Sequence, residues 1–189
     1  MGLKLKYFFK NLFKKKTPVQ TAVISTIDLT ESGLVINGEP VDMPIHISVL
    51  KTIFGEPRVI GFKTDKETKE FLEGLHGDGM VTKRVNYTWD DLGIYCYTLN
   101  GSVVNSIGIR LSMQGDTYKY TPSKTYKGAV TIEGRPWFER INEGEDMEVF
   151  RRCELGPYSI VSEYADPFDD GERTEKDYVD LEINLKLGG

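Results

Sequence analysis

The chain has 189 residues, of which 39% are hydrophobic and 28% are charged. That length suits one large domain or two small ones, and ten Tyr and nine Phe supply apolar area for a core, which argues against a disordered chain. The net charge of −5 argues against a nucleic-acid-binding protein, and two cysteines are too few for a secreted disulfide scaffold.

The first sixteen residues differ in charge from the rest of the chain. They carry six lysines and no acid, so they sum to +6 and the remaining residues sum to −11. Apolar side chains recur there at the spacing of one helical face, at Leu5, Phe8, Phe9, Leu12 and Phe13. Pro18 ends the pattern. The sequence therefore predicts a basic amphipathic leader over residues 1–18.

Three hypotheses describe this leader: it packs on the body or frays as a terminus, it lies on an anionic membrane surface, or it is a targeting signal. The membrane contacts of the second hypothesis are Phe8, Phe9, Leu12, Phe13, Lys10 and Lys14. No run of about 18 apolar residues suits a transmembrane helix, and the cleavage site of a secretory signal is missing. We expect a cytoplasmic protein, with a peripheral position at the inner membrane face as the alternative.

Residues 19–113 are predicted to form a first α+β unit. Its early elements, in chain order, are strands over Thr21–Thr30 and Gly33–Asn37, a return strand from Val41, a helix over Ile47–Phe54, a strand over Val59–Phe62 and a helix over Thr64–Leu75. Asn37-Gly38 is a strong hairpin-turn pair. Gly55 is expected to cap the first helix, and Thr64 and Glu67 to form a capping box on the second.

The stretch 81–113 gives the clearest strand pattern. Apolar and polar residues alternate around Tyr87 and Trp89. The turn sequences Asp90-Asp91-Leu92-Gly93 and Asn100-Gly101 then separate two further strand-like segments. Three strands joined by tight turns predict an antiparallel meander.

Residues 114–126 are rich in turn formers and are predicted to link the first unit to a second, β-rich unit at 127–189. The second unit is expected to contain a helical turn over Trp137–Ile141 and strands over Met147–Leu155, Tyr158–Tyr164 and Tyr178–Leu187. Along the last strand, apolar residues alternate strictly with Asp180, Glu182, Asn184 and Lys186. This alternation predicts a half-buried strand with a charged outer face.

One short phrase occurs in both halves. Ile36-Asn37-Gly38-Glu39-Pro40 returns as Ile132-Glu133-Gly134-Arg135-Pro136, and a helix-like stretch and strand-like stretches follow each copy. The elements together predict an α+β fold of antiparallel sheets with few short helices. Two tandem copies of one α+β unit are a further hypothesis.

Residues that carry common catalytic or metal chemistry are scarce. His46 and His76 stand apart from any recognisable nucleophile motif, and together with Cys96 and Cys153 they form no cluster of zinc ligands in the sequence. The cysteines lie in strand-like runs, so buried reduced thiols are expected, with a disulfide as the alternative. The sequence predicts neither an enzyme nor a bound cofactor. An enzyme that uses only Asp, Glu and Tyr is the remaining alternative, which a deep cavity lined by paired carboxylates would favour.

Two acidic segments are candidate partner-binding sites, and their residues are Asp166, Asp169, Asp170, Glu172, Asp90 and Asp91. The first has the Asp-Gly spacing of part of a calcium-binding loop, although Phe168 stands at the third ligand position and Asp177 at the twelfth. A solvated loop, a calcium site and a carboxylate cluster that pairs with a basic protein are the three hypotheses for it. For Trp89-Asp90-Asp91, a carbohydrate or acid/base site competes with a turn that has Trp89 in the core.

Three segments carry a resemblance to a known family: Gly33-Leu34-Val35-Ile36-Asn37-Gly38, Phe54-Gly55-Glu56-Pro57-Arg58 and Tyr87-Thr88-Trp89-Asp90-Asp91-Leu92-Gly93-Ile94. They resemble uncharacterised bacterial domains found near secreted-toxin and type VI secretion loci, which are suspected immunity proteins. The resemblance covers residues 25–111, and 126–189 only through the repeated phrase. It implies a protein-binding role, in which a cytoplasmic protein blocks a cognate toxin, for example a basic toxin domain, and it implies no catalytic residues. The alternative function is a membrane-surface adaptor that docks through its leader.

Overall fold

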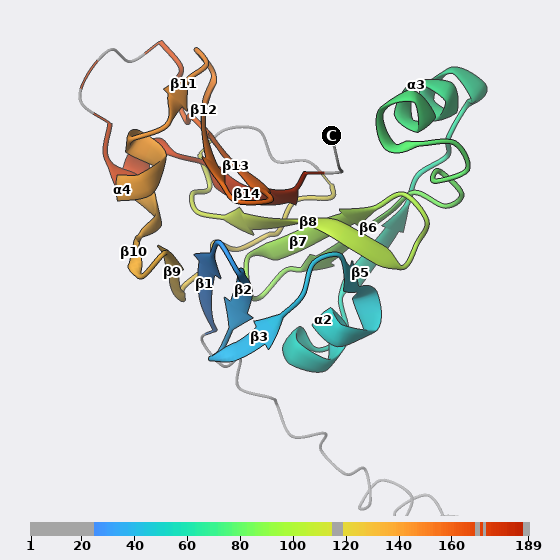
Figure 1. The fold of residues 1–189 in the computed structure, drawn as a ribbon, viewed down its shortest axis with the longest axis horizontal. Coiled ribbons are helices and arrows are strands. Elements are labelled where there is room, and N and C mark those ends of the chain that lie inside the picture. Colours follow the sequence, from blue (N-terminus) through green and yellow to red (C-terminus); the bar gives the residue numbers. More distant parts are fainter. Residues whose placement is uncertain (1–24, 115–118, 169–170, 172, 187–189) are drawn as a thin grey trace, which may run out of the picture.

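The computed structural model describes residues 25–114, 119–168, 171 and 173–186, and the strands of this part form two sheets (Figure 1). The smaller sheet follows the order β10-β9-β1-β2-β3. Its strands are β1 Thr26–Thr30, β2 Gly33–Ile36, β3 Glu39–Val41, β9 Ala129–Ile132 and β10 Arg135–Pro136.

The larger sheet follows the order β11-β12-β13-β14-β8-β7-β6-β5, and β4 pairs with β8 beside this path. Its strands are β4 Ile45–His46, β5 Arg58–Gly61, β6 Val85–Trp89, β7 Ile94–Thr98, β8 Val103–Arg110, β11 Glu145–Asp146, β12 Phe150–Leu155, β13 Tyr158–Glu163 and β14 Asp180–Leu185. The predicted meander is confirmed as β6, β7 and β8, which pair antiparallel in chain order.

Strands from both ends of the chain contribute to each sheet. β1 pairs in parallel with β9, so that Leu29 stands opposite Ile132. β14 lies between β8 and β13 and is antiparallel to both. The other strand pairs of the described chain are antiparallel, and with the short helices this architecture agrees with the predicted α+β class.

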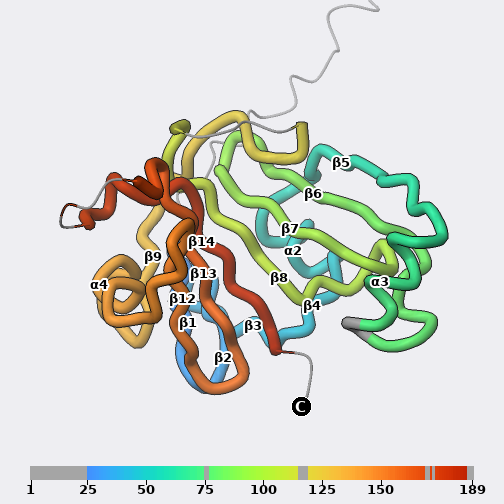
Figure 2. The backbone as a smooth tube through the Cα atoms, turned by 90° about the horizontal axis from the view of Figure 1, so that it is seen from above, coloured from blue at the N-terminus to red at the C-terminus, as the bar shows by residue number. Residues whose placement is uncertain are grey.

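The smaller sheet lies against the larger one (Figure 2). One hydrophobic cluster includes buried residues of both sheets, so the core lies between them. Leu29 of β1, Ile109 of β8 and Leu181 of β14 are completely buried in it. Each such aliphatic side chain stabilises the fold by roughly 1.5–3 kcal/mol relative to an exposed position. Because neighbouring residues in a strand point to opposite faces, this packing also decides which side chains of the larger sheet face away from the core.

The helices of the described chain are α2 Ile47–Phe54, α3 Lys66–His76 and α4 Trp137–Asn142, and a 3-10 turn, η1, covers Glu175–Asp177. α2 has the predicted bounds, and the N–H of Gly55 closes it on Lys51. The predicted capping box on α3 is wrong. Asp65 is the N-cap, and its carboxylate accepts a hydrogen bond of 2.7 Å from the N–H of Thr68, so α3 starts one residue later than the predicted box requires.

Both copies of the repeated phrase form a tight hairpin turn in the smaller sheet. The φ angles are 55° and 83° at Asn37 and Gly38, and 53° and 73° at Glu133 and Gly134. Two successive positive φ angles are typical of the type I′ turn, whose twist matches the paired strands. The first copy joins β2 to β3 and the second joins β9 to β10, so the hairpin predicted at Asn37-Gly38 is confirmed.

Candidate functional site

The face of the larger sheet that points away from the core carries polar and aromatic side chains. Along β7, β8 and β14, core residues alternate with residues on this face. The strand register places Tyr95 and Glu182 on either side of Gly108, and Asp180 opposite Arg110. Side chains from three strands therefore meet at one point of the sheet.

Gly108 provides the space for the ring of Tyr95. A Cβ atom at position 108 would lie 2.1 Å from Cζ of Tyr95, so the ring lies directly over the glycine backbone. The hydroxyl group then stands 3.1 Å from Oδ2 of Asp180 and 3.0 Å from Oε1 of Glu182. A phenol has one proton to donate, so both contacts are full hydrogen bonds only when one carboxyl group is itself protonated.

The electrostatics of this cluster favour a shared proton. Burial raises the pKa of Glu182, and the nearby charge of Asp180 raises it further. Burial also raises the pKa of Asp180, but hydrogen bonding from Tyr95 and the charge of Arg110 oppose that rise. The pKa of Tyr95 is held well above its ordinary value by burial and by both carboxylates. The cluster thus carries one negative charge more easily than two.

Arg110 decides where that charge resides. It lies opposite Asp180 on β8, is 2% exposed, and donates from Nη2 to the carbonyl oxygen of Gln114 at 2.9 Å. Its Nε has no hydrogen-bond partner in the described part of the chain. Because a guanidinium group is always charged, Arg110 opposes the rise in the pKa of Asp180, whereas the charges of Asp180 and Glu163 raise the pKa of Glu182.

A groove of about 510 Å³ opens over Glu182. Asp180 does not line it, whereas Glu182 and Tyr95 do. The remaining polar lining residues include Asn86, Asn105, Ser106 and Asn184. The floor of the groove is therefore rich in groups that donate and accept hydrogen bonds.

One wall of the groove is aromatic. The ring of Phe62 meets Tyr97 and Tyr120 edge to face, each with centroids 6.0 Å apart. The guanidinium carbon of Arg84 lies 5.4 Å from the ring centroid of Phe62 and 5.7 Å from that of Tyr97. The stacked cation and rings form a wall that offers flat apolar area beside the acidic floor.

Asp90, together with Arg58, holds residues 119–123 in place, and this segment includes Tyr120 of the aromatic wall. Its carboxylate accepts two hydrogen bonds from Arg58, of 2.6 and 2.9 Å, and a third of 3.0 Å from the N–H of Ser123. Arg58 also donates to the carbonyl oxygens of Lys119 and Thr121. These internal bonds lower the pKa of Asp90, chiefly through the hydrogen bond from Arg58. The neighbouring Trp89 is buried, as the turn hypothesis predicted.

The other predicted partner-binding residues lie along one end of the larger sheet. Asp91 is exposed and pairs with Lys124, and Asp166 is exposed beyond β13. The strand order puts four strand spacings between β6 and β13, so the two strands that precede Asp91 and Asp166 are about 19 Å apart. Asp169, Asp170 and Glu172 lie outside the described residues, as do the leader residues Phe8, Phe9, Leu12, Phe13, Lys10 and Lys14.

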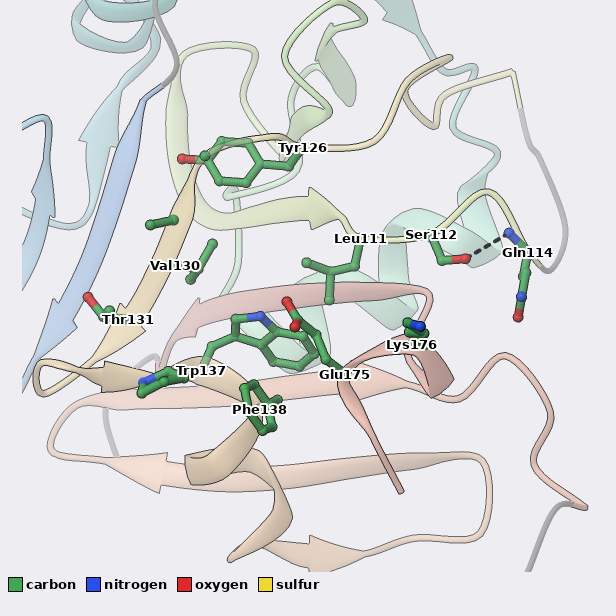
Figure 3. Close-up of a pocket in the computed structure, with 13 residues that line it drawn as sticks. Leu111, Ser112, Gln114, Tyr126, Val130, Thr131, Trp137, Phe138, Glu175 and Lys176 are labelled. Carbon is green, nitrogen blue, oxygen red and sulfur yellow. Dashed lines mark hydrogen bonds between the residues drawn. The ribbon is translucent and has the colours of Figure 1, made fainter. Parts of the chain in front are cut away.

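A second cavity, of about 680 Å³, lies between β9, the start of α4, η1 and residues 111–114 (Figure 3). The aromatic and aliphatic side chains of Leu111, Tyr126, Val130, Trp137 and Phe138 line it, and Glu175 and Lys176 of η1 stand at its rim. It is distinct from the groove over Glu182, because the two share no lining residue.

His46, Cys96 and Cys153 have structural roles in the described part of the chain. Nδ1 of His46 accepts the N–H of Ser48 at 3.3 Å and so caps α2. Cys96 and Cys153 are both free and buried, and burial raises their pKa to about 12 and about 11. In the described ranges, no group of three His, Cys, Asp or Glu side chains is arranged to hold a metal ion. No helix there is long and apolar enough to cross a bilayer.

Sequence reasoning missed the cluster of Tyr95, Asp180 and Glu182. The alternation of apolar and polar residues in the last strand does place Asp180 and Glu182 on one face, and this is the part of the cluster that the sequence indicates. It assigned them to a charged outer face, whereas burial against Tyr95 raises the pKa of both. Their tyrosine partner comes from a strand 85 residues away, through the non-sequential order β14-β8-β7.

A comparison with protein families matches residues 26–147 to the family described as Domain of unknown function (DUF7738). The match spans more than half of the chain, so the chain belongs to this family. No curated protein and no solved structure matches the chain.

Proposed function

We propose that the protein is a non-enzymatic binding module of the immunity type, which blocks a cognate bacterial toxin. The groove over Glu182 is its recognition site, and it receives a Lys or Arg side chain of the toxin. The observation that carries this proposal is a carboxyl group at the floor of an aromatic-walled groove, with its ionisation held back by burial and by Asp180.

Entry of a cation would convert that carboxyl group into a strong acceptor. A positive charge within a few ångströms lowers the pKa of a carboxyl group, so binding of the partner would favour the carboxylate form of Glu182 and release any proton that it holds. The resulting charge-assisted hydrogen bond forms in a partly desolvated site, where it is stronger than in water. Because Arg84 already lies on Phe62 and Tyr97, the aliphatic stem of the incoming side chain would pack against the apolar lining residues Leu99, Val103 and Leu185.

The charge of the whole chain supports the same kind of partner. Outside the first sixteen residues the sequence sums to −11. An acidic body accelerates the encounter with a basic protein and disfavours acidic ones. Asp91 and Asp166 do not line the groove, so they would add to this attraction only through the overall charge.

The groove favours binding over catalysis by a carboxyl pair. General acid–base catalysis by two carboxyl groups requires both to reach the substrate. Glu182 faces the groove, and Asp180 is turned toward Tyr95 and Arg110 without lining it. The pair therefore presents one functional carboxyl group to a ligand.

The test uses the purified products of the genes that flank the coding gene, titrated into the full-length protein by calorimetry in buffers of different ionisation enthalpy. One product is expected to bind and to release protons. Glu182→Gln is expected to weaken binding at least tenfold and to abolish the proton release, because a neutral amide cannot form the ion pair. Glu31→Gln, which makes the same charge change on the exposed β1–β2 turn, serves as the control. Equal affinity of wild type and Glu182→Gln would remove the groove from the proposal.

We also propose that the two hairpin-and-helix segments descend from one duplicated unit. What supports this is the shared turn conformation at Asn37-Gly38 and Glu133-Gly134, followed in each case by a short helix. Exchange of the two five-residue phrases is expected to leave the unfolding midpoint nearly unchanged; loss of folding would count against equivalence.

A further inference from the structure

The second cavity is lined by Trp137, whose indole group faces an apolar space. Trp137 is 3% exposed, and its ring meets Phe138 and Tyr178 edge to face at 6.2 and 5.4 Å. In Figure 3 the indole ring points into the cavity, toward Leu111 and Val130. Its Nε1 makes no hydrogen bond within the described residues and is not among their fully buried atoms without a partner, so it is accessible from the cavity.

The size and lining of the cavity suit aromatic side chains. At about 680 Å³ it is more than four times as large as a cavity of roughly 150 Å³ that accommodates benzene. Its walls are aromatic and aliphatic, and Glu175 and Lys176, of opposite charge, stand at its rim (Figure 3). The expected occupant therefore presents apolar rings.

The described chain begins at the rim of this cavity. Tyr126 and Gly128 both line it. The hydroxyl group of Tyr126 donates to the carbonyl oxygen of Ser25, and a Cβ atom at Gly128 would lie 1.8 Å from the same oxygen. Ser25 is thus fixed against two lining residues, and the preceding residues are connected to the chain at that point.

The leader has the chemistry that the cavity requires, and it is within reach. Its predicted apolar face includes Phe8, Phe9 and Phe13, and six lysines accompany it. Twelve residue steps separate Phe13 from Ser25, which allows up to about 40 Å of extended chain. A segment tethered over such a length has an effective concentration in the millimolar range, so even a weak contact would be occupied.

We propose that this cavity is the docking site for the protein's own leader, residues 1–18. The phenylalanine rings pack on Trp137 and Phe138, and the lysines lie over Glu175 and the acidic body. Docking gives the indole N–H a polar partner on the leader backbone and covers Leu111 and Val130. The contact is intramolecular and does not depend on the proposed toxin-binding role of the groove.

The two indole N–H signals of the full-length protein, in ¹⁵N-resolved NMR spectra, test this proposal. Trp89 donates to the carbonyl oxygen of Gly55 in the core and serves as an internal reference, and Trp137 reports on the cavity. The signals are assigned with Trp137→Phe. In a full-length variant with Phe8, Phe9, Leu12 and Phe13 changed to Ser, the Trp137 signal is expected to move and the Trp89 signal to stay. A synthetic peptide of residues 1–18 is expected to move it back, and a peptide with the same four Ser substitutions is expected to have no effect.

Three results would overturn the proposal. The first is a Trp137 signal that is identical in wild type and in the Ser variant. The second is a wild-type Trp137 signal that shifts on dilution, which would mean that the leader binds a second copy of the chain. The third is a wild-type protein whose leader binds vesicles of one quarter phosphatidylglycerol while the Trp137 signal stays unchanged, which would assign the leader to the membrane.

Discussion

At the scale of single residues, the contact between Gly108 and Tyr95 holds the candidate site together. The ring of Tyr95 lies over position 108, and its hydroxyl group is placed between two carboxyl groups only because no side chain stands there. This glycine is required for a close approach of a neighbouring strand's side chain, and it does not lie in a turn.

Gly108→Ala tests this contact. The new methyl group would overlap the ring of Tyr95, so the ring must move away from Asp180 and Glu182. We expect a loss of about 1–3 kcal/mol in the free energy of unfolding, the usual cost of overpacking, measured by urea denaturation. Gly61→Ala, in edge strand β5, has no atom within 4 Å of the new Cβ and is the matched control. An equal effect of both substitutions would contradict the proposed contact.

The raised pKa of Glu182 predicts an unusual pH dependence. A carboxyl group whose folded pKa is raised stabilises the protein fully below its unfolded pKa of about 4.3, and this stabilisation is lost as pH rises through the folded pKa. Between pH 5 and pH 8 the wild type should therefore lose more stability than Glu182→Gln. The difference amounts to about 1.4 kcal/mol for each unit by which the folded pKa exceeds the unfolded one.

A second carboxyl group provides the control for that measurement. Hydrogen bonding from Lys186 lowers the pKa of Glu154, so its contribution is present above its unfolded pKa and is lost at more acidic pH. Glu154→Gln should shift the urea midpoint by the same amount at pH 5 and pH 8. Parallel curves for wild type and Glu182→Gln over this range would contradict the raised pKa of Glu182.

At the scale of elements, local chemistry determined most strand and helix positions. The alternation around Tyr87 and Trp89 and the spacing in Ile47–Phe54 gave elements with nearly the observed bounds, because each pattern reflects one buried face. The order of the strands in the sheets could not be predicted from the sequence. Nothing in the residues of β14 shows that it pairs with β8 and β13, so the meeting of Tyr95 with Asp180 could not be predicted.

α3 has no buried side chain among residues 66–74. Phe71 on this helix is 67% exposed, and the carboxylate of Asp65 caps its first turn. Asp65→Ala is expected to increase hydrogen exchange throughout α3, because the first turn loses its acceptor, while β8 exchanges as before. Peptide-resolved exchange with mass spectrometry measures this, and Asp65→Asn, which keeps a capping oxygen, is the control. Unchanged exchange in α3 would mean that the cap contributes nothing.

At the scale of the whole molecule, the pairing of β1 with β9 and of β8 with β14 makes both sheets depend on both halves of the chain. Residues 1–124 and 125–189, expressed as separate fragments, are therefore expected to be poorly folded alone and to assemble when mixed. Circular dichroism of each fragment and of the mixture measures this, with the intact chain as the reference. A fragment that unfolds cooperatively by itself would contradict the prediction.

β14 lies outside the region that the family match covers. The family match ends at residue 147, before β12, β13 and β14, yet β14 occupies the edge of β8 and covers its backbone groups. Without β14, the backbone groups on that side of β8 would be unpaired, and an unpaired strand edge can pair with a strand of another protein. A relative that carried only the matched region would need another strand on β8, from its own extension or from a second protein. The same edge that closes this chain upon itself would in such a relative be a point of assembly.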